Sequence, residues 1–207
     1  MQPLIIVPYR DRADNLKEFI PAIKAYLPQA EIVVVEQCGT ELFNKGSLIN
    51  IGMLEAGGMG DYFMFHDVDL IPIKVDYSYP DKPTHVATEL SQYDYKMPYP
   101  KYFGGCVLFT KDQFESVNGF SNKFNGWGCE DDSFFDSFAA KGIMIERRSG
   151  RFESLYHTRD YNPKDFGKNV ATHREGRDFS EGVSTVEYDI QSVVVKEDYI
   201  HYKACLK

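Results

Sequence analysis

Long hydrophobic runs are absent from this 207-residue sequence, whose apolar stretches, such as residues 4–8 and 32–35, are short. A membrane-spanning helix needs about 20 consecutive apolar residues, so no membrane span is expected. The chain enters a strand-like segment almost at its first residue, which leaves no room for a signal peptide or an anchoring stem. These absences lead us to expect a cytoplasmic protein.

Basic residues are outnumbered, because 23 Lys and Arg face 31 Asp and Glu and the formal net charge is −8. Nucleic acids and anionic membranes select clustered Lys and Arg, so neither is expected as the main partner. An acidic protein still binds a diphosphate when a divalent cation lies between the two. The charge therefore leaves phosphate-bearing small molecules as candidate ligands.

Cysteine is scarce, and Cys38, Cys106, Cys129 and Cys205 are too scattered to form a CxxC pair. A structural zinc site is therefore not expected. A domain of this size builds a sizeable core without a disulfide framework. We therefore expect four buried, reduced thiols.

Apolar runs and helical patterns alternate along the first third of the chain. The predicted strands and helices follow one another at residues 4–7, 16–27, 32–35, 48–53 and 62–65. Strand, helix, strand, helix, strand is typical of a parallel α/β sheet. Pro21 lies inside the first helical pattern, where its missing N–H predicts a kink or a break.

The rest of the chain has a less regular pattern. The predicted strands are 84–88, 103–110 and 192–195, and the predicted helices are 111–117 and 130–141. A loop rich in Tyr and Pro covers residues 93–102, and signals between residues 145 and 192 are weak. Because no repeat, low-complexity tract or clear linker interrupts the pattern, a single domain over residues 1–207 is expected.

Two aspartates directly follow the third predicted strand, in the sequence His66-Asp67-Val68-Asp69. Ligand sites of open α/β sheets lie at the carboxyl ends of strands, and side chains two residues apart in an extended segment share a face. Carboxylate oxygens suit Mg²⁺ or Mn²⁺, which usually binds one or two carboxylates together with substrate phosphates. A bare Asp-x-Asp is common by chance, so two solvated aspartates at a strand end are the alternative.

The only tryptophan, Trp127, lies between Gly126 and Gly128, shortly before the Glu-Asp-Asp of residues 130–132. Carboxylates at a helix start are favoured by the helix dipole, so capping explains part of this pattern. Capping does not explain the indole, whose flat face suits a sugar ring, or the glycines, which let backbone approach a ligand. A carboxylate beside such a face is placed to act as a general base toward a sugar hydroxyl.

Two further motifs have simple alternative explanations. His157 lies in a polar stretch, where a lone histidine is more often a surface residue than a metal ligand. Residues 8–12 (Pro-Tyr-Arg-Asp-Arg) end the first predicted strand. They are either a turn with solvated charges or a nucleotide-binding loop whose arginines meet phosphate or base.

Taken together and in this order, the motifs resemble the β-1,4-galactosyltransferase family (glycosyltransferase family 7), over roughly residues 4 to 190. Residues 66–72 and 118–132 are most similar to the branch that galactosylates xylose on proteoglycan linkers. The motifs that carry the resemblance are PYRDR (8–12), FNK (43–45), HDVDLIP (66–72), YFGG (102–105), NGFSN (118–122), GWGCEDD (126–132) and HTRD (157–160).

The resemblance implies an α/β fold of GT-A type with a mixed, mostly parallel central sheet, a UDP-sugar donor and Mn²⁺ or Mg²⁺. It implies a nucleotide-binding half of about residues 1–75 and an acceptor and catalytic half of about residues 76–207. It further implies that Asp69 and His157 bind the metal ion and that Asp131 is the catalytic base. The residues implied to bind the acceptor are Trp127, Glu130 and Asp132. Those implied to bind the donor are Pro8, Tyr9, Arg10, Arg12, Phe43, Lys45, Asp67, Val68, Tyr102, Gly105 and Trp127.

Three positions depart from the family pattern. Lys45 stands where relatives often have arginine, which keeps the charge but loses bidentate geometry. Ser154 replaces a methionine of one branch, and Arg159 replaces a second histidine of the xylose-directed branch. The metal site is therefore expected to depend on Asp69 and His157 together with water and diphosphate.

The sequence thus predicts an inverting, metal-dependent transfer of galactose from UDP-galactose to the hydroxyl of a saccharide acceptor. One base and no enzymic nucleophile lead to inversion. Tyr102 matches the position that faces the C2 substituent of the donor, and relatives with a smaller aliphatic residue there accept N-acetylgalactosamine. The alternatives are transfer of N-acetylgalactosamine or glucose on the same fold and a non-catalytic nucleotide-sugar-binding module.

Overall fold

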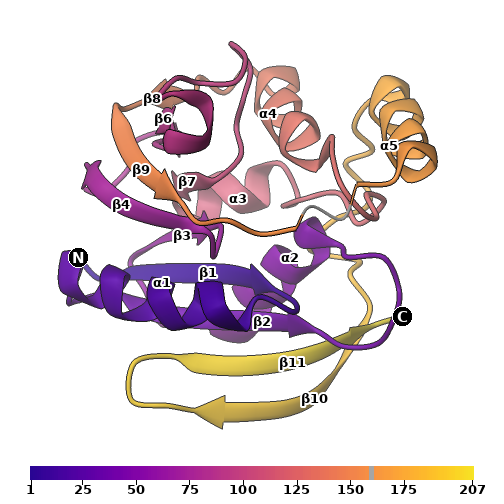
Figure 1. Cartoon of the computed structure of the whole chain (residues 1–207). Helices are drawn as coiled ribbons and strands as arrows, with labels where there is room; N and C mark the ends of the chain where they lie inside the picture. Colours follow the sequence, from indigo (N-terminus) through magenta and orange to yellow (C-terminus); the bar gives the residue numbers. More distant parts are fainter. Residues whose placement is uncertain (159–160) are drawn as a thin grey trace.

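The structure, a computed structural model, describes residues 1–158 and 161–207, and Figure 1 traces the chain from end to end. The strands are β1 (Pro3–Tyr9), β2 (Glu31–Gln37), β3 (Tyr62–His66), β4 (Leu70–Val75), β5 (Thr84–His85), β6 (Glu89–Leu90), β7 (Cys106–Phe109), β8 (Glu146–Arg147), β9 (Gly150–Ser154), β10 (Tyr188–Val195) and β11 (Ile200–Leu206). The helices are α1 (Ala13–Tyr26), α2 (Lys45–Ala56), the 3₁₀ helix η1 (Ser91–Tyr93), α3 (Lys111–Ser116), α4 (Glu130–Ala140) and α5 (Pro163–Glu175).

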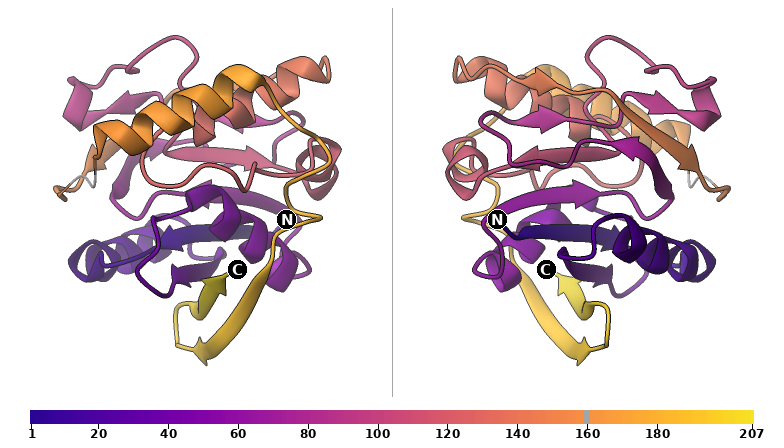
Figure 2. Two further views of the ribbon diagram at one scale, coloured as in Figure 1. Left: turned by 90° about the vertical axis from the view of Figure 1, so that its right-hand side faces the viewer. Right: turned by 90° about the vertical axis from the view of Figure 1, so that its left-hand side faces the viewer.

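Eight strands form the central sheet in the order β10-β11-β2-β1-β3-β7-β5-β8. β11, β2, β1 and β3 are parallel neighbours, as are β5 and β8, whereas β10 with β11, β3 with β7 and β5 with β7 are antiparallel. A smaller sheet of β4, β9 and β6 completes the fold. The prediction of a mixed, mostly parallel α/β sheet is confirmed, and Figure 2 shows it from two sides.

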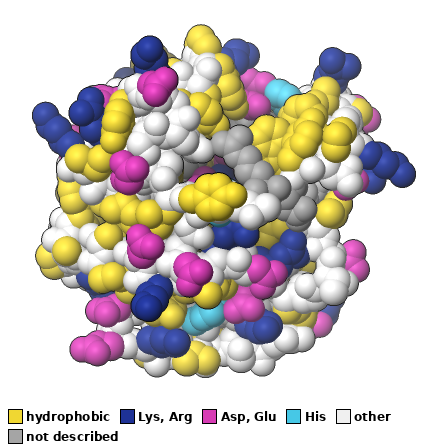
Figure 3. All heavy atoms as spheres, in the orientation of Figure 1, with side chains coloured by type: hydrophobic (Ala, Val, Ile, Leu, Met, Phe, Trp, Pro, Cys, Tyr) yellow, Lys and Arg dark blue, Asp and Glu magenta, His cyan; other side chains and the backbone are white. Residues whose placement is uncertain are grey.

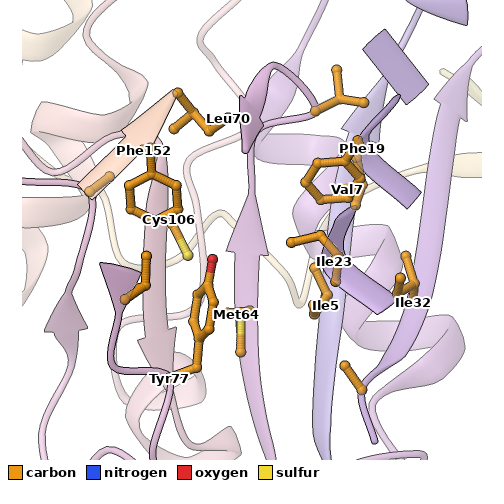
Figure 4. Close-up of a cluster of buried hydrophobic side chains, with 14 of the residues drawn as sticks. Ile5, Val7, Phe19, Ile23, Ile32, Met64, Leu70, Tyr77, Cys106 and Phe152 are labelled. Atoms are coloured by element: carbon orange, nitrogen blue, oxygen red, sulfur yellow. The ribbon is translucent and has the colours of Figure 1, made fainter. Parts of the chain in front are cut away.

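The central strands are buried on both faces, which explains why they appear in the sequence as continuous apolar runs rather than alternating ones. On one face, Ile5 and Met64 belong to the same buried cluster as Phe19 of α1, and Phe152 of β9 lies beside Cys106 (Figure 4). The opposite face packs against α2, α3 and α4. Besides aliphatic side chains, it buries a group of phenylalanines, namely Phe63, Phe65, Phe103, Phe109, Phe114, Phe120, Phe134 and Phe138.

Helix α1 continues through Pro21, so a break at this residue, one of the two predicted outcomes, does not occur. Pro21 lies on the exposed side of the helix, while Leu16, Phe19 and Ile23 form the buried stripe. A carbonyl that loses its N–H partner on the exposed side can bond to water instead. The apolar stripe therefore holds the helix together despite the proline.

The second half contains elements that the sequence pattern does not predict. α5 is mostly polar, and only Asn169 of its side chains is buried, so its apolar periodicity is weak. β7 begins at Cys106 rather than at residue 103, because Gly105 adopts a positive φ of 81° and bends the chain. This bend places the Tyr102-to-Gly105 segment at the edge of the candidate site.

Cys38 and Cys205 form a disulfide with their Cα atoms 5.0 Å apart, so the expectation of four reduced thiols is wrong. The two cysteines are 167 residues apart in the sequence. They meet because β11 pairs in parallel with β2, with Ala204 opposite Gln37, and because the N–H of Cys38 donates to the carbonyl of Ala204 at 2.8 Å. Residue spacing alone does not reveal such a pairing.

We expect Cys38→Ser to lower the free energy of unfolding by about 2–4 kcal/mol, because the cross-link restricts the unfolded chain. Urea unfolding without reductant measures this loss. Cys129→Ser is the matched control, since Cys129 is a free and only partly buried thiol. Adding reductant is expected to destabilise the parent protein and leave the Cys38→Ser variant unchanged; equal stability of the two proteins without reductant would contradict the disulfide.

Charges of both signs are interspersed on the face seen in Figure 3, where Lys and Arg do not gather into a single basic area. Of the helices within residues 1–158 and 161–207, none is long and apolar enough to cross a membrane.

Candidate active site

The predicted site residues gather where β1 and β3 end and where α2 and α4 begin. β1 ends at Tyr9 and β3 at His66, and these parallel neighbours end on the same edge of the sheet. Ligands of open α/β sheets bind at this edge. α2 adds Lys45 at its first residue, and α4 adds the carboxylates of residues 130–132 in its first turn.

The Asp67-Val68-Asp69 segment is a turn rather than the extended segment expected from the sequence, because the N–H of Leu70 donates to the carbonyl of Asp67 at 3.3 Å. Val68 is buried and both aspartates are partly exposed. The N–H of Asp67 donates to the carbonyl of Gly105 at 2.8 Å, which continues the pairing of β3 with β7. The two carboxylates contact different partners, because Asp67 lies beside Lys45 and Asp69 beside His157. They therefore form two adjoining parts of one site.

Asp69 and His157 meet through the antiparallel pairing of β4 with β9, in which Leu70 lies opposite Ser154. The N–H of Leu155 then donates to the carbonyl of Asp69 at 2.7 Å, and the chain carries His157 past the carboxylate. Nδ1 of His157 lies 3.2 Å from Oδ2 of Asp69, and contact with this carboxylate raises the pKa of the imidazole.

The donor set of Asp69 and His157 fits a divalent cation. Nδ1 of His157 is buried, and its 3.2 Å contact with Oδ2 of Asp69 does not have hydrogen-bond geometry, so this nitrogen makes no hydrogen bond among the described residues. A neutral imidazole nitrogen and a carboxylate oxygen are ligands that Mn²⁺ accepts. Ser154 supplies no thioether, as expected from the sequence, and Arg159 lies outside the described residues. Two protein ligands leave room for diphosphate oxygens and water.

Lys45 lies among three carboxylates rather than at the surface. Its Nζ is 3.0 Å from Asp67 Oδ1, 3.1 Å from Asp131 Oδ2 and 4.0 Å from Glu130 Oε1. Burial lowers the pKa of Lys45, but these carboxylates together raise it well above its usual value. One ammonium cannot neutralise three carboxylates, so the surplus negative charge favours a cation nearby.

Asp131 combines one paired oxygen with one unpaired oxygen. Oδ2 accepts a hydrogen bond from Lys45, whereas the buried Oδ1 has no partner in the part of the chain that the structure describes. Burial raises the pKa of Asp131 well above its ordinary value, although Lys45 opposes this shift. A raised pKa and an unpaired oxygen are the properties a general base needs.

Trp127 is exposed to solvent by a loop whose backbone conformation glycine adopts more easily than other residues. Gly126 and Gly128 have φ values of 77° and 104°, in the left-handed region that favours glycine. The indole is 46% exposed and lies 5.5 Å from the ring of Tyr161 and 5.4 Å from the ring of Phe166. The exposed part of the indole is a flat apolar surface suited to a sugar ring, and Tyr161 and Phe166 pack against it at an angle.

Tyr99 is a site residue that the sequence analysis did not single out. Its hydroxyl donates to Oδ1 of Asp132 at 2.9 Å and so orients this carboxylate. The residue lies in the loop of residues 93–102, which the sequence marks only as rich in Tyr and Pro. An exposed tyrosine in such a loop is a signal, but its partner depends on the tertiary structure.

The residues predicted to bind the nucleotide divide into partly exposed and buried groups. The guanidinium of Arg10 lies 5.4 Å from the ring centre of Phe43, and Arg12 donates to the carbonyl of Thr158 at 2.8 Å. Pro8, Tyr9 and Val68 are buried, so their side chains are not free to contact a nucleotide. Backbone groups are what these three positions can offer.

Comparison with known proteins agrees with this geometry. The profile described as "N-terminal region of glycosyl transferase group 7" matches residues 2–80, and the profile described as "N-terminal domain of galactosyltransferase" matches residues 84–160. The fold is that of GT-A glycosyltransferases. The chain belongs to the β-1,4-galactosyltransferase family, glycosyltransferase family 7.

Individual relatives confirm the family. Human β-1,4-galactosyltransferase 1 is 33% identical over 204 residues, or 91% of this chain and 51% of that protein. The xylosylprotein 4-β-galactosyltransferase of Caenorhabditis elegans is 35% identical over 205 residues, or 91% of this chain and 71% of that protein. The chain spans about half the length of the first curated relatives it matches.

Solved structures of a Drosophila relative are also similar. The catalytic domain of Drosophila β-1,4-galactosyltransferase 7 in complex with xylobiose matches with a TM-score of 0.87 and 30% identity, over 100% of this chain and 94% of that one. A second structure of the Drosophila protein, a mutant, contains manganese, UDP-Gal and xylobiose and matches with a TM-score of 0.85. The GT-A fold predicted from the motifs is confirmed.

Proposed function

We propose that this chain transfers galactose from UDP-galactose to a hydroxyl of a saccharide acceptor, with a divalent metal ion and with inversion at the anomeric carbon. The observation that carries the proposal is Asp131, whose buried Oδ1 has no partner among the described residues while Oδ2 is held by Lys45. Family membership and the Drosophila complex with manganese, UDP-Gal and xylobiose support the same donor and metal.

In the proposed reaction, the acceptor hydroxyl donates its proton to Oδ1 of Asp131 as its oxygen attacks the anomeric carbon. The bond to the UDP oxygen breaks on the opposite side, so an α-linked donor gives a β-linked product. Lys45 keeps Asp131 in place through its ion pair at 3.1 Å. Trp127, Glu130 and Asp132 orient the acceptor, which reduces the entropy lost on reaching the transition state.

Asp69 and His157 would hold the metal ion of this reaction. Bound there, Mn²⁺ would neutralise the charge that develops on the diphosphate leaving group. Arg10 and Phe43, 5.4 Å apart, are the proposed contacts of phosphate and uracil. A guanidinium pairs with phosphate in a bidentate manner, and an aromatic ring stacks on a base.

Release of UDP tests the proposal directly. We would incubate the purified chain with UDP-galactose and Mn²⁺, with and without xylosides, glucosaminides and their disaccharides as acceptors. Acceptor-dependent UDP release is the expected result, and NMR of the product identifies the anomeric configuration. UDP binding without acceptor-dependent release for any saccharide would favour the non-catalytic nucleotide-sugar-binding module.

Donor choice is expected to depend on Tyr102. Its hydroxyl is close enough to Asp67 and Asp131 to feel their charge. Burial, and to a lesser extent these two carboxylates, raises the pKa of the hydroxyl well above its usual value. A phenol here occupies the space that an N-acetyl group needs. Tyr102→Leu is therefore expected to raise the ratio of kcat/KM for UDP-N-acetylgalactosamine over UDP-galactose, measured with one acceptor.

The matched control for donor choice is Tyr95→Leu, a change at an exposed tyrosine whose hydroxyl bonds Glu153 instead. It should leave the donor ratio unchanged. A parent protein that already prefers UDP-N-acetylgalactosamine or UDP-glucose, or a ratio that Tyr102→Leu does not alter, would overturn the galactose assignment. The transferase proposal would survive that outcome.

The cytoplasmic location stays a prediction. The disulfide between Cys38 and Cys205 favours a different, oxidising compartment. Disulfides form and persist mainly in oxidising compartments. We propose that the chain matures where Cys38 and Cys205 are oxidised. Thiol alkylation of the protein in its source cells, followed by mass spectrometry, would show the pair protected; two alkylated thiols would restore the cytoplasmic prediction.

A further inference from the structure

Arg147, at the end of β8, holds the loop of residues 99–104, which lies against the carboxylates of the site. Its Nη1 donates to the carbonyl of Tyr102 at 2.7 Å, and its Nη2 donates to the carbonyl of Pro100 at 3.0 Å. The same guanidinium lies 5.8 Å from the ring centre of Phe135 on α4. One side chain therefore joins the loop to the helix that carries Asp131 and Asp132.

His85 fixes both the guanidinium and the next turn of the loop. Its Nδ1 is 2.6 Å from Nη1 of Arg147. A guanidinium nitrogen can only donate, so Nδ1 of His85 accepts this hydrogen bond. Nε2 then carries the hydrogen and donates to the carbonyl of Gly104 at 2.9 Å. Burial lowers the pKa of His85 to about 3, with Arg147 adding to the shift, so the ring remains neutral.

The loop held in this way faces the carboxylates of the site. Tyr99 donates to Asp132, and Gly104 is so close to Asp131 that a Cβ at this position would lie 2.5 Å from Oδ2. Neither residue lies in a strand or helix, because η1 ends at Tyr93 and β7 begins at Cys106. The loop is therefore held by side-chain bonds to its carbonyls and by the buried Phe103, which packs against α4, rather than by sheet pairing.

We propose that Arg147, oriented by His85, is a positioning residue that fixes residues 99–104 against Asp131 and Asp132 and thereby sets the affinity for the acceptor sugar. The proposal rests on the function proposed above, since it names the device that shapes its acceptor site. A guanidinium suits this role, because its several N–H groups reach two carbonyls and an imidazole at once. A misplacement of the loop by about 1 Å is enough to cost up to roughly 10²-fold in rate.

The test compares two neighbouring arginines. Arg147→Met removes the donors and keeps the apolar stem, whereas Arg148→Met removes a similarly half-buried arginine that bonds Ser78, Tyr79 and Glu146 instead. We expect Arg147→Met to raise the acceptor KM by about tenfold or more, with a smaller fall in kcat. Binding of UDP with Mn²⁺, measured by calorimetry, should not change in either variant.

Two further results separate positioning from general destabilisation. Arg147→Lys keeps the charge without the fork and should give an intermediate KM, whereas Arg148→Met should lower Tm and leave KM unchanged. An Arg147→Met protein with the parent KM, or an Arg148→Met protein with the same rise in KM, would overturn the proposal. Inactivity of the parent protein toward every acceptor would instead count against the proposed function.

A readout that needs no activity tests the loop itself. Lys101 is an exposed trypsin site inside the held segment, with a side chain that is 69% exposed. We expect native-state cleavage after Lys101 to be faster in Arg147→Met than in the parent protein or in Arg148→Met. Equal cleavage rates in all three proteins would overturn the proposal, whatever the outcome of the transfer assay.

Discussion

Asp131→Asn is expected to lower turnover by roughly 10²-fold or more, because it removes the base and keeps the shape of the side chain. Lys45 retains Asp67 and Glu130 as partners at 3.0 and 4.0 Å, so the fold around it should survive. Binding of UDP with Mn²⁺ should persist, since the proposed metal ligands are untouched. Steady-state kinetics with saturating donor measure the loss.

The pH profile gives a second measure of the same role. A base is active only when deprotonated, and burial raises the pKa of Asp131, so parent turnover should fall as the pH decreases through this raised pKa. The residual rate of Asp131→Asn should lack this decrease. Asp136→Asn, further along α4, is the matched control and should keep normal turnover. Near-normal turnover of Asp131→Asn would refute the assignment of the base.

Asp69→Ala is expected to abolish metal-dependent binding of UDP, because a carboxylate is the strongest ligand for a hard cation in this site. His157→Ala should weaken Mn²⁺ binding less, since it removes one neutral ligand. Its imidazole lies 3.2 Å from the Asp69 carboxylate, so the two variants test one site. Calorimetric titration of UDP in the presence and absence of Mn²⁺ measures both effects.

The control for the metal site lies at the other end of the same strand. Asp69 directly precedes β4, and Asp76 directly follows it and is mostly exposed near Arg148. Asp76→Ala should therefore leave UDP and Mn²⁺ binding unchanged. If Asp69→Ala bound UDP with Mn²⁺ as tightly as the parent protein, the metal ion would have to lie elsewhere.

The sequence predicts the parts of this fold and site that depend on near neighbours. The βαβαβ start is predictable because strands buried on both faces are short apolar runs and helices are periodic. Asp67 and Asp69 are predicted to lie at the carboxyl-end edge of the sheet because they follow a strand. Residues 130–132 are predicted to begin a helix. The polar helix α5 is not predicted, because only Asn169 of its side chains is buried and the sequence therefore has no apolar periodicity there.

By itself, the sequence thus determined the class of fold, the family and the residue types that carry the proposed chemistry. Only the tertiary structure decided which of them meet. Lys45 reaches Asp131 across 86 residues, and Cys38 reaches Cys205 across 167. The register of β4 with β9 brings His157 to Asp69, and that of β5 with β8 places Arg147 beside His85. Register and crossover follow from the packing of the whole core, so no local pattern in the sequence contains them.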